Sequence, residues 1–209
     1  MNDAGPGRAG PVDTPPAGRA GTEPLVGTVG IRPLHAGDGA ALARAYVRNR
    51  DHLAPWEPRR PESWFTGHGQ EENVARRLAE HERGATLAWV LVDGDDVVGT
   101  MTVGGIVRGP FLSGNLGYWI DGTYTGRGLA TAAVAYAAAA CAEDGLHRLQ
   151  AGTLLHNAAS QTVLRRNGFE PIGVARRYLC IAGSWQDHVL LERILEDRTG
   201  SAAASAASG

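Results

Sequence analysis

Cysteine is scarce in this sequence, because 209 residues contain only Cys141 and Cys180, far apart in the chain. No spacing of metal-binding type surrounds either thiol, and the seven histidines are scattered. These absences argue against a disulfide framework and against a zinc site. Because both cysteines lie in apolar stretches, we expect two reduced, buried thiols.

Long apolar runs and a strong excess of one charge are also missing. The net charge is -2, which gives no field to hold a polyanion. The alanine-rich stretch 128–142 is the nearest candidate for a membrane span, but it is short and weakly hydrophobic. The amino terminus lacks the apolar core of a signal peptide. We therefore expect a cytoplasmic protein with neither nucleic acid nor a membrane as its partner.

Large apolar side chains are nearly absent from both ends of the chain. Residues 1–27 are mostly Gly, Pro and Ala, and residues 197–209 are similarly low in complexity. Such segments cannot bury enough surface to offset the entropy of ordering them. We expect two disordered tails around one domain at 28–196, which is long enough for a single core.

Between these tails, apolar periodicity and turn residues predict a mixed succession of elements. Strands are expected at 29–34, 86–92, 96–107, 113–121, 147–155, 169–182 and 185–194, and helices at 38–50, 70–83, 128–143 and 157–166. Prolines interrupt residues 53–65, so we expect no regular structure there, although Trp56, Trp64 and Phe65 favour burial. The pattern predicts an α/β (α+β) domain with a mixed, mostly antiparallel sheet flanked by helices.

The segment 118–131 joins a predicted strand to a predicted helix through a glycine-bearing turn. Gly126 and Gly128 strip side chains from this turn just before the helix begins. The first N–H groups of a helix lack intrahelical partners and lie at the positive end of its dipole. This arrangement favours an anion, for which a pyrophosphate is the natural occupant, with Arg127 adding charge at the rim.

Two familiar phosphate motifs do not fit this segment. A dinucleotide fingerprint would need Gly or Ala at Thr131 and an acidic residue after the next strand. A nucleotide P-loop would need Gly-Lys-Ser/Thr, which is absent here. A turn that merely joins strand to helix is left as the alternative to an anion site.

The stretch 116–169 resembles the core of the GNAT superfamily of N-acetyltransferases. The acetyl-CoA signature of that superfamily is Arg/Gln-x-x-Gly-x-Gly/Ala, and residues 125–130 match it at Gly128 and Ala130. Thr125 departs from the signature at its first position. Asn157-x-x-Ser160, followed by Asn167-Gly168-Phe169, resembles the second cofactor helix of the superfamily.

A narrower resemblance covers residues 29–195. Residues 53–58, 157–160 and 178–188 are similar to the ribosomal-protein alanine N-acetyltransferases of RimJ/RimL type. The resemblance implies transfer of acetyl from acetyl-CoA to a primary amine, above all the N-terminal α-amino group of a ribosomal protein. A small amine as acceptor, such as an antibiotic, a polyamine or an amino-acid derivative, is the first alternative. A non-catalytic acyl-CoA-binding module is the second.

The resemblance also implies a set of cofactor-binding residues. Main-chain groups of Trp119, Ile120 and Asp121 would pair with the pantetheine arm like an additional strand. The pyrophosphate would lie on the loop and helix start that contain Thr125, Gly126, Arg127, Gly128, Leu129, Ala130 and Thr131. Asn157 would bond the pantetheine or cap its own helix, and the two roles are compatible.

Ser160 is the first candidate for the proton donor to the departing thiolate. Many superfamily members carry a tyrosine seven residues after the asparagine, where this chain has Leu164. Ser160 lies one helical turn after Asn157 and should face the same way. Tyr178 is the alternative donor.

Glu57 is the candidate general base, because packing against neighbouring aromatic residues would raise the pKa of its carboxyl group. Strand alternation directs at most one of Asp187 and His188 into the site. Proton removal through water, with no single base, is the remaining route. Exposed sheet edges would allow a homodimer.

Overall fold

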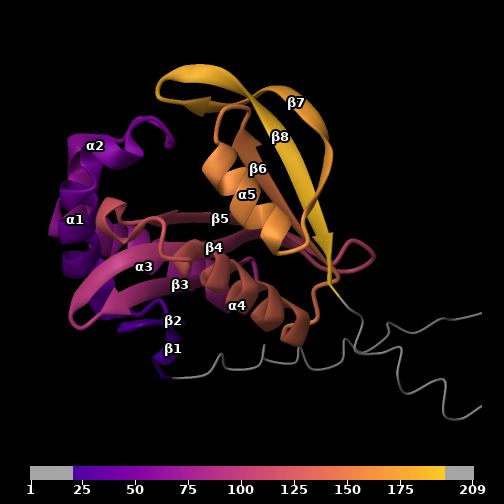
Figure 1. Cartoon of the computed structure of the whole chain (residues 1–209). Helices are drawn as coiled ribbons and strands as arrows, with labels where there is room; N and C mark the ends of the chain where they lie inside the picture. Colours follow the sequence, from indigo (N-terminus) through magenta and orange to yellow (C-terminus); the bar gives the residue numbers. More distant parts are fainter. Residues whose placement is uncertain (1–20, 196–209) are drawn as a thin grey trace, which may run out of the picture.

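Alternating apolar residues build a sheet that organises the whole fold. The computed structural model describes residues 21–195, and these form one eight-stranded sheet in the order β1-β2-β3-β4-β5-β6-β8-β7 (Figure 1). The strands are β1 Glu23–Val26, β2 Val29–Pro33, β3 Thr86–Asp93, β4 Asp96–Val107, β5 Ser113–Ile120, β6 Arg148–Leu154, β7 Glu170–Ile181 and β8 Ser184–Ile194. The predicted fold class is confirmed.

Every pair of neighbouring strands is antiparallel except β5 and β6, which are parallel. Strands β3 and β4, predicted at 86–92 and 96–107, form a hairpin, and Gly94 takes its turn with φ of 58°. The parallel pair needs a crossover, which α4 (Leu129–Glu143) supplies. The strand–loop–helix–strand unit anticipated from the sequence therefore occupies the middle of the sheet.

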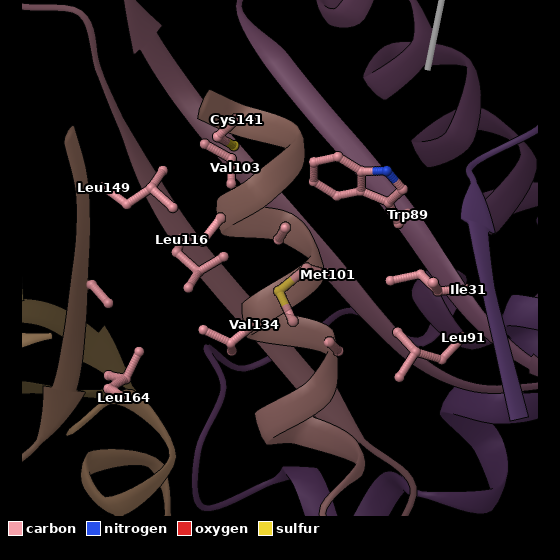
Figure 2. Close-up of a cluster of buried hydrophobic side chains, with 14 of the residues drawn as sticks. Ile31, Trp89, Leu91, Met101, Val103, Leu116, Val134, Cys141, Leu149 and Leu164 are labelled. Carbon is pink, nitrogen blue, oxygen red and sulfur yellow. The ribbon is translucent and has the colours of Figure 1, made fainter. Parts of the chain in front are cut away.

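Helices cover both faces of the sheet and bury two separate cores. On one face, α4 and α5 (Ala158–Arg166) cover the larger core, and Figure 2 shows Val134 and Cys141 of α4 among Met101, Val103 and Leu116 of the sheet. The other face carries α1 (Gly39–Arg48), α2 (Arg50–Leu53) and α3 (Gly67–Glu82) over the smaller core. Side chains of successive strand residues point into opposite cores, as the period-two alternation of a strand requires.

Polar caps and glycines set the ends of several helices. Thr66 accepts a hydrogen bond from Gly69 N–H at the start of α3. Gly145 follows α4 with φ of 80°, and Gly168 follows α5 with φ of 74°. No helix within residues 21–195 is long and apolar enough to cross a membrane.

The structure corrects three expectations. Residues 23–26, assigned to the disordered tail, form β1, because their backbone pairs with β2 and Leu25 and Val26 pack against the larger core. A short 3₁₀ turn, η2 (Glu62–Phe65), interrupts the proline-rich segment. Cys180 is exposed because β7 is an edge strand, whereas Cys141 is buried as expected. Residues 1–20 and 196–209, which include most of the tail predicted at 1–27 and all of the tail predicted at 197–209, lie outside the described residues.

Candidate active site

The turn before α4 has the backbone that the anion-site hypothesis requires. Gly126 and Gly128 have φ of 76° and 80°, in the left-handed region that side chains disfavour. The first helical hydrogen bond runs from Ala132 N–H to Gly128 C=O, so the N–H groups of residues 129–131 precede the intrahelical ladder. Residues 125–128 are exposed, and Arg127 lies over the Tyr124 ring at 5.0 Å. This loop offers main-chain donors and a cation to an anion.

Asp121 anchors the loop through its side chain. Its carboxylate accepts hydrogen bonds from Arg48 Nε and Asn49 Nδ2 at 2.7 Å each, and from Thr123 N–H at 2.9 Å. Burial alone would raise the pKa of this carboxyl, but these bonds lower it to about 2. The residue is 1% exposed, so the start of the loop is fixed to α1 from inside the protein.

A wedge opens in the sheet directly before this loop. Strands β5 and β6 pair only through residues 113–115 and 148–150. Beyond these residues the strands separate, although β5 continues to Ile120 and β6 to Leu154. The facing edges of residues 116–120 and 151–154 therefore carry main-chain groups that do not pair with each other. A ligand arm with amide groups can pair there like a strand.

The register decides which main-chain groups face the wedge. Asp121 N–H donates to Val98 C=O across the β4–β5 pair, so odd-numbered residues of β5 direct their main-chain groups toward β4. On the other side, Leu112 C=O accepts from Arg148 N–H, which directs even-numbered residues toward β6. The two observations agree.

This register corrects part of the sequence prediction. The main-chain groups of Trp119 and the N–H of Asp121 face β4, and the Asp121 carbonyl accepts a hydrogen bond from Tyr124 N–H, so these groups do not line the wedge. Those of Tyr118 and Ile120 do, and the Ile120 carbonyl also lies 3.2 Å from His52 Nε2. Residue spacing alone could not show this. It predicts that main-chain groups alternate in direction along a strand, but not which strand lies on each side.

Ser160 lies at the start of α5, beside the wedge. Asn157 caps this helix, and its Oδ1 accepts a hydrogen bond from Ser160 N–H at 3.0 Å. The predicted capping role of Asn157 is thus confirmed. The Ser160 hydroxyl lies 2.9 Å from the phenolic oxygen of Tyr118 on β5. Sequence reasoning missed this pair, since the two residues belong to different elements.

Leu164 has no access to the wedge. Its side chain is fully buried in the larger core, one turn further along α5 than Ser160. Burial raises the pKa of Tyr118 to about 12 against the opposing effect of its bond to Ser160, so the phenol stays protonated at neutral pH. Ser160 and Tyr118 therefore bring two protonated hydroxyl groups together beside the wedge.

Glu57 lies in a separate pocket on the opposite face of the sheet. This pocket has a volume of about 240 Å³ and is lined by Tyr46, Arg50, Leu53, Ala54, Glu57, Pro58, Arg59, Arg60 and Phe65. Burial raises the pKa of the Glu57 carboxyl, while Arg60, with Nε 3.4 Å from Oε2, opposes the shift. Partial burial thus shifts the pKa of Glu57 upward, the direction that a general base requires.

The β7–β8 hairpin reaches over to the Glu57 segment. Ala182 N–H donates to Glu57 C=O at 3.0 Å, and Figure 1 shows the hairpin arching toward α2. On the neighbouring turn, the Trp56 and His156 rings lie 5.5 Å apart. Residues distant in sequence thus meet at the segment that contains Trp56 and Glu57. Trp56 itself is 39% exposed, less buried than its aromatic character suggested.

A bulge in β7 positions Tyr178. The register slips between Ala175 and Leu179, Arg177 has φ of 49°, and its N–H donates to the Asp187 carboxylate at 2.8 Å. This carboxylate therefore stabilises the bulge. The Tyr178 ring packs on buried His188, with centroids 5.6 Å apart.

Tyr178 and Ser160 lie on opposite faces of β6. A Cβ at Gly152 would lie 3.4 Å from the Tyr178 ring, whereas Leu149 and Ala151 point into the core under α5. Alternation along β6 therefore separates the two candidate proton donors.

A larger pocket, of about 370 Å³, lies away from the wedge, between α3, β3 and the second half of α4. Its lining includes Trp89 and Tyr136 but no residue of the loop or of α5. Within residues 21–195, no group of three or more His, Cys, Asp or Glu side chains is arranged to hold a metal ion. The chemistry of the candidate site therefore rests on the wedge, the loop and the Glu57 pocket.

A split sheet beside a glycine loop at a helix start offers main-chain partners both to an extended amide-bearing arm and to an anionic group of one ligand. Residues 28–170 match the model of the acetyltransferase (GNAT) domain, and the chain belongs to this family.

Individual relatives agree with the family. The chain is 35% identical over 175 residues to the [ribosomal protein uS5]-alanine N-acetyltransferase of Escherichia coli, covering 81% of this chain and 89% of the relative. The structure of ribosomal-protein-S5-alanine acetyltransferase from Vibrio fischeri superposes with a TM-score of 0.80 at 32% identity, covering 84% of this chain and 97% of that one. Mycobacterium smegmatis RimJ in complex with CoA-disulfide gives 0.78 at 33%, with coverage of 83% and 86%.

Proposed function

We propose that this protein transfers the acetyl group of acetyl-CoA to the N-terminal α-amino group of a ribosomal protein. The observation that carries the proposal is the wedge between β5 and β6, with the glycine loop on one side and the Glu57 pocket on the other. Relatives named for acetylation of ribosomal protein S5 support this choice of acceptor over a small amine. A ribosomal acceptor also implies a cytoplasmic location.

The two halves of the site lie on opposite faces of β5. Tyr118 packs in the core under α4 and α5, whereas Trp119 packs against Tyr46, with ring centroids 5.1 Å apart. Tyr46 also lines the Glu57 pocket. A cofactor on the Tyr118 face and an acceptor on the Trp119 face would therefore meet at the wedge.

Acetyl-CoA fits the first half of this site and would supply the thioester that is transferred. The N–H groups of residues 129–131, with Gly126, Gly128 and Arg127, would hold its pyrophosphate. Main-chain groups of Tyr118 and Ile120 would pair with the pantetheine arm, and Asn157 would add its free Nδ2 donors. The absence of Arg or Gln at position 125 would cost little affinity, because main-chain N–H groups would bind the pyrophosphate.

Three side chains divide the proton transfers in this proposal. Glu57 would accept a proton from the acceptor amine directly or through water, since an α-amino group has a pKa of about 7.7–8.0. Ser160 would donate its proton to the departing thiolate and recover one from solvent. Tyr178, on the acceptor-side face of β6, would line the acceptor path rather than serve as the acid.

Titration of acetyl-CoA into the purified protein, followed by mass spectrometry of acceptors, tests the proposal. Peptides beginning with Ala or Ser should be acetylated at the α-amine, and the same peptides with a blocked α-amine should not. Turnover confined to polyamines, antibiotics or amino-acid derivatives would instead establish a small-amine enzyme. Binding of acetyl-CoA with no turnover of any amine would establish a non-catalytic module.

We further propose a homodimer formed through the free edge of β7. Ile172, Val174 and Leu179 on this strand are 47%, 58% and 45% exposed. Light scattering should give twice the mass of one chain, and Val174→Lys should halve it. A single-chain mass for the unmodified protein at assay concentrations would reject the dimer.

A further inference from the structure

A tyrosine that no sequence motif singles out lies against the candidate acid. Tyr118 projects from β5 on one side of the wedge, and Ser160 projects from α5 on the other. Their hydroxyl oxygens lie 2.9 Å apart, a normal hydrogen-bond distance. Within the described residues, this bond connects the two elements at the point where the strands have separated.

The backbone of Ser160 is fixed, so only the orientation of its hydroxyl group is left to be set. Asn157 Oδ1 fixes the Ser160 N–H at the helix start. A serine hydroxyl has one proton and can turn it toward Tyr118 or away from it. A phenol is a stronger donor than an aliphatic alcohol, and the half-buried Tyr118 phenol keeps its proton at neutral pH. Tyr118 is therefore the natural donor of the pair.

We propose that Tyr118 is a positioning residue for Ser160. Its phenol O–H donates to Ser160 Oγ, which directs the serine proton into the wedge and stabilises the charge that develops on Oγ as that proton is given up. The phenol itself transfers no proton. This inference rests on the acid role of Ser160 set out above, and it adds the group that makes a serine hydroxyl an effective donor.

The placement of neighbouring residues supports a functional reading of this bond. Leu164, the α5 position where the family resemblance anticipates a tyrosine, points into the core. The strand therefore supplies the phenol that the helix lacks. Tyr118 is also an even-numbered β5 residue, so its main chain faces the wedge at the place proposed for the pantetheine.

A double-mutant cycle with Tyr118→Phe and Ser160→Ala tests the proposal. The kcat should fall about tenfold in Tyr118→Phe, as expected for loss of one hydrogen bond in the transition state, with KM for acetyl-CoA changed by less than about twofold. In the Ser160→Ala background, Tyr118→Phe should change kcat by less than about twofold, because its acceptor is gone. Equal losses in both backgrounds would overturn the inference.

Two further measurements separate the ways in which the idea can fail. Tyr136→Phe, which alters a ring packed edge-to-face on Trp89 in the distant pocket, should leave kcat unchanged. If Ser160→Ala retains full kcat, the acid role fails, and the positioning role fails with it. If the unmodified protein acetylates no α-amine, the acceptor assignment fails, and the same cycle run with an accepted small amine still decides the role of Tyr118.

Discussion

The cofactor half and the acceptor half of this site are built in opposite ways. The cofactor half comes from one continuous segment, in which Asp121, two glycines and the start of α4 follow one another. The acceptor half is assembled from distant segments, as Ala182 bonds to Glu57 and Trp56 packs on His156. A shared family chemistry needs a constant cofactor site, whereas a chosen acceptor needs a surface that can vary, and loops provide it.

The largest effect is expected at the junction of the two halves, at Ser160. Ser160→Ala should lower kcat about a hundredfold, the lower end of what a positioned general acid contributes, without changing the affinity for acetyl-CoA. Thr162→Ala is the matched control, because this exposed hydroxyl of the same helix bonds only to the Ala158 carbonyl. Steady-state kinetics with an acceptor peptide measures both. A Ser160→Ala enzyme within twofold of the parent would move the acid to water or to Tyr178.

Asp121 provides a test of how firmly the cofactor half is anchored. Its folded pKa of about 2 lies below the unfolded value of about 3.9, so its contribution is fully present above pH 5 and is lost as pH falls toward 2. We expect about 2 kcal/mol of unfolding free energy to disappear over that range. Urea unfolding at several pH values measures it.

Asp121→Asn should remove most of this pH dependence and lower stability at pH 7 by a similar amount. Asp95→Asn, in the exposed β3–β4 turn, should do neither. An unchanged pH profile in Asp121→Asn would show that the anchor lies elsewhere.

Glycines at the two ends of α4 separate backbone strain from ligand binding. Gly128 and Gly145 share φ of 80°, and an added Cβ at either meets nothing within 4 Å. Alanine at either position should therefore cost about 1 kcal/mol of stability. Calorimetry should show about tenfold weaker acetyl-CoA binding for Gly128→Ala alone, as a shifted N–H cradle implies. Equal affinities in the two variants would remove the loop from the cofactor site.

Glu57 should give the smallest effect, on the acceptor side. The rate should fall as pH drops through the raised pKa of Glu57, because only the carboxylate accepts a proton. Glu57→Gln should lack this limb and lose less than about tenfold in kcat/KM at pH 8, where much of an α-amine is already neutral. Glu62→Gln, at an exposed carboxylate paired with Arg50, is the control. An unchanged pH profile in Glu57→Gln would favour water as the base.

The same contrast explains what the sequence could predict. The glycine loop, the Asn157 cap and the ends of α4 and α5 follow from local rules and agree with the structure, whereas the helix predicted at 70–83 begins at Gly67. The Tyr118–Ser160 bond spans 42 residues and depends on how far β5 and β6 stay paired, which no local pattern encodes. The main-chain assignment of Trp119 and Asp121 was wrong for a related reason, because alternation does not say which neighbour lies on which side.

The short seam between β5 and β6 has a mechanical consequence. Three residue pairs join the two halves of the sheet, and beyond them the angle of the wedge depends on side chains and on the hairpin contact to Glu57. The separated ends of β5 and β6 are thus the part of the sheet that deforms most easily. A bound pantetheine would supply the main-chain hydrogen bonds that these ends lack. Amide hydrogen exchange at residues 151–154 should therefore slow when acetyl-CoA is added, while exchange in the paired core of β3 and β4 stays the same.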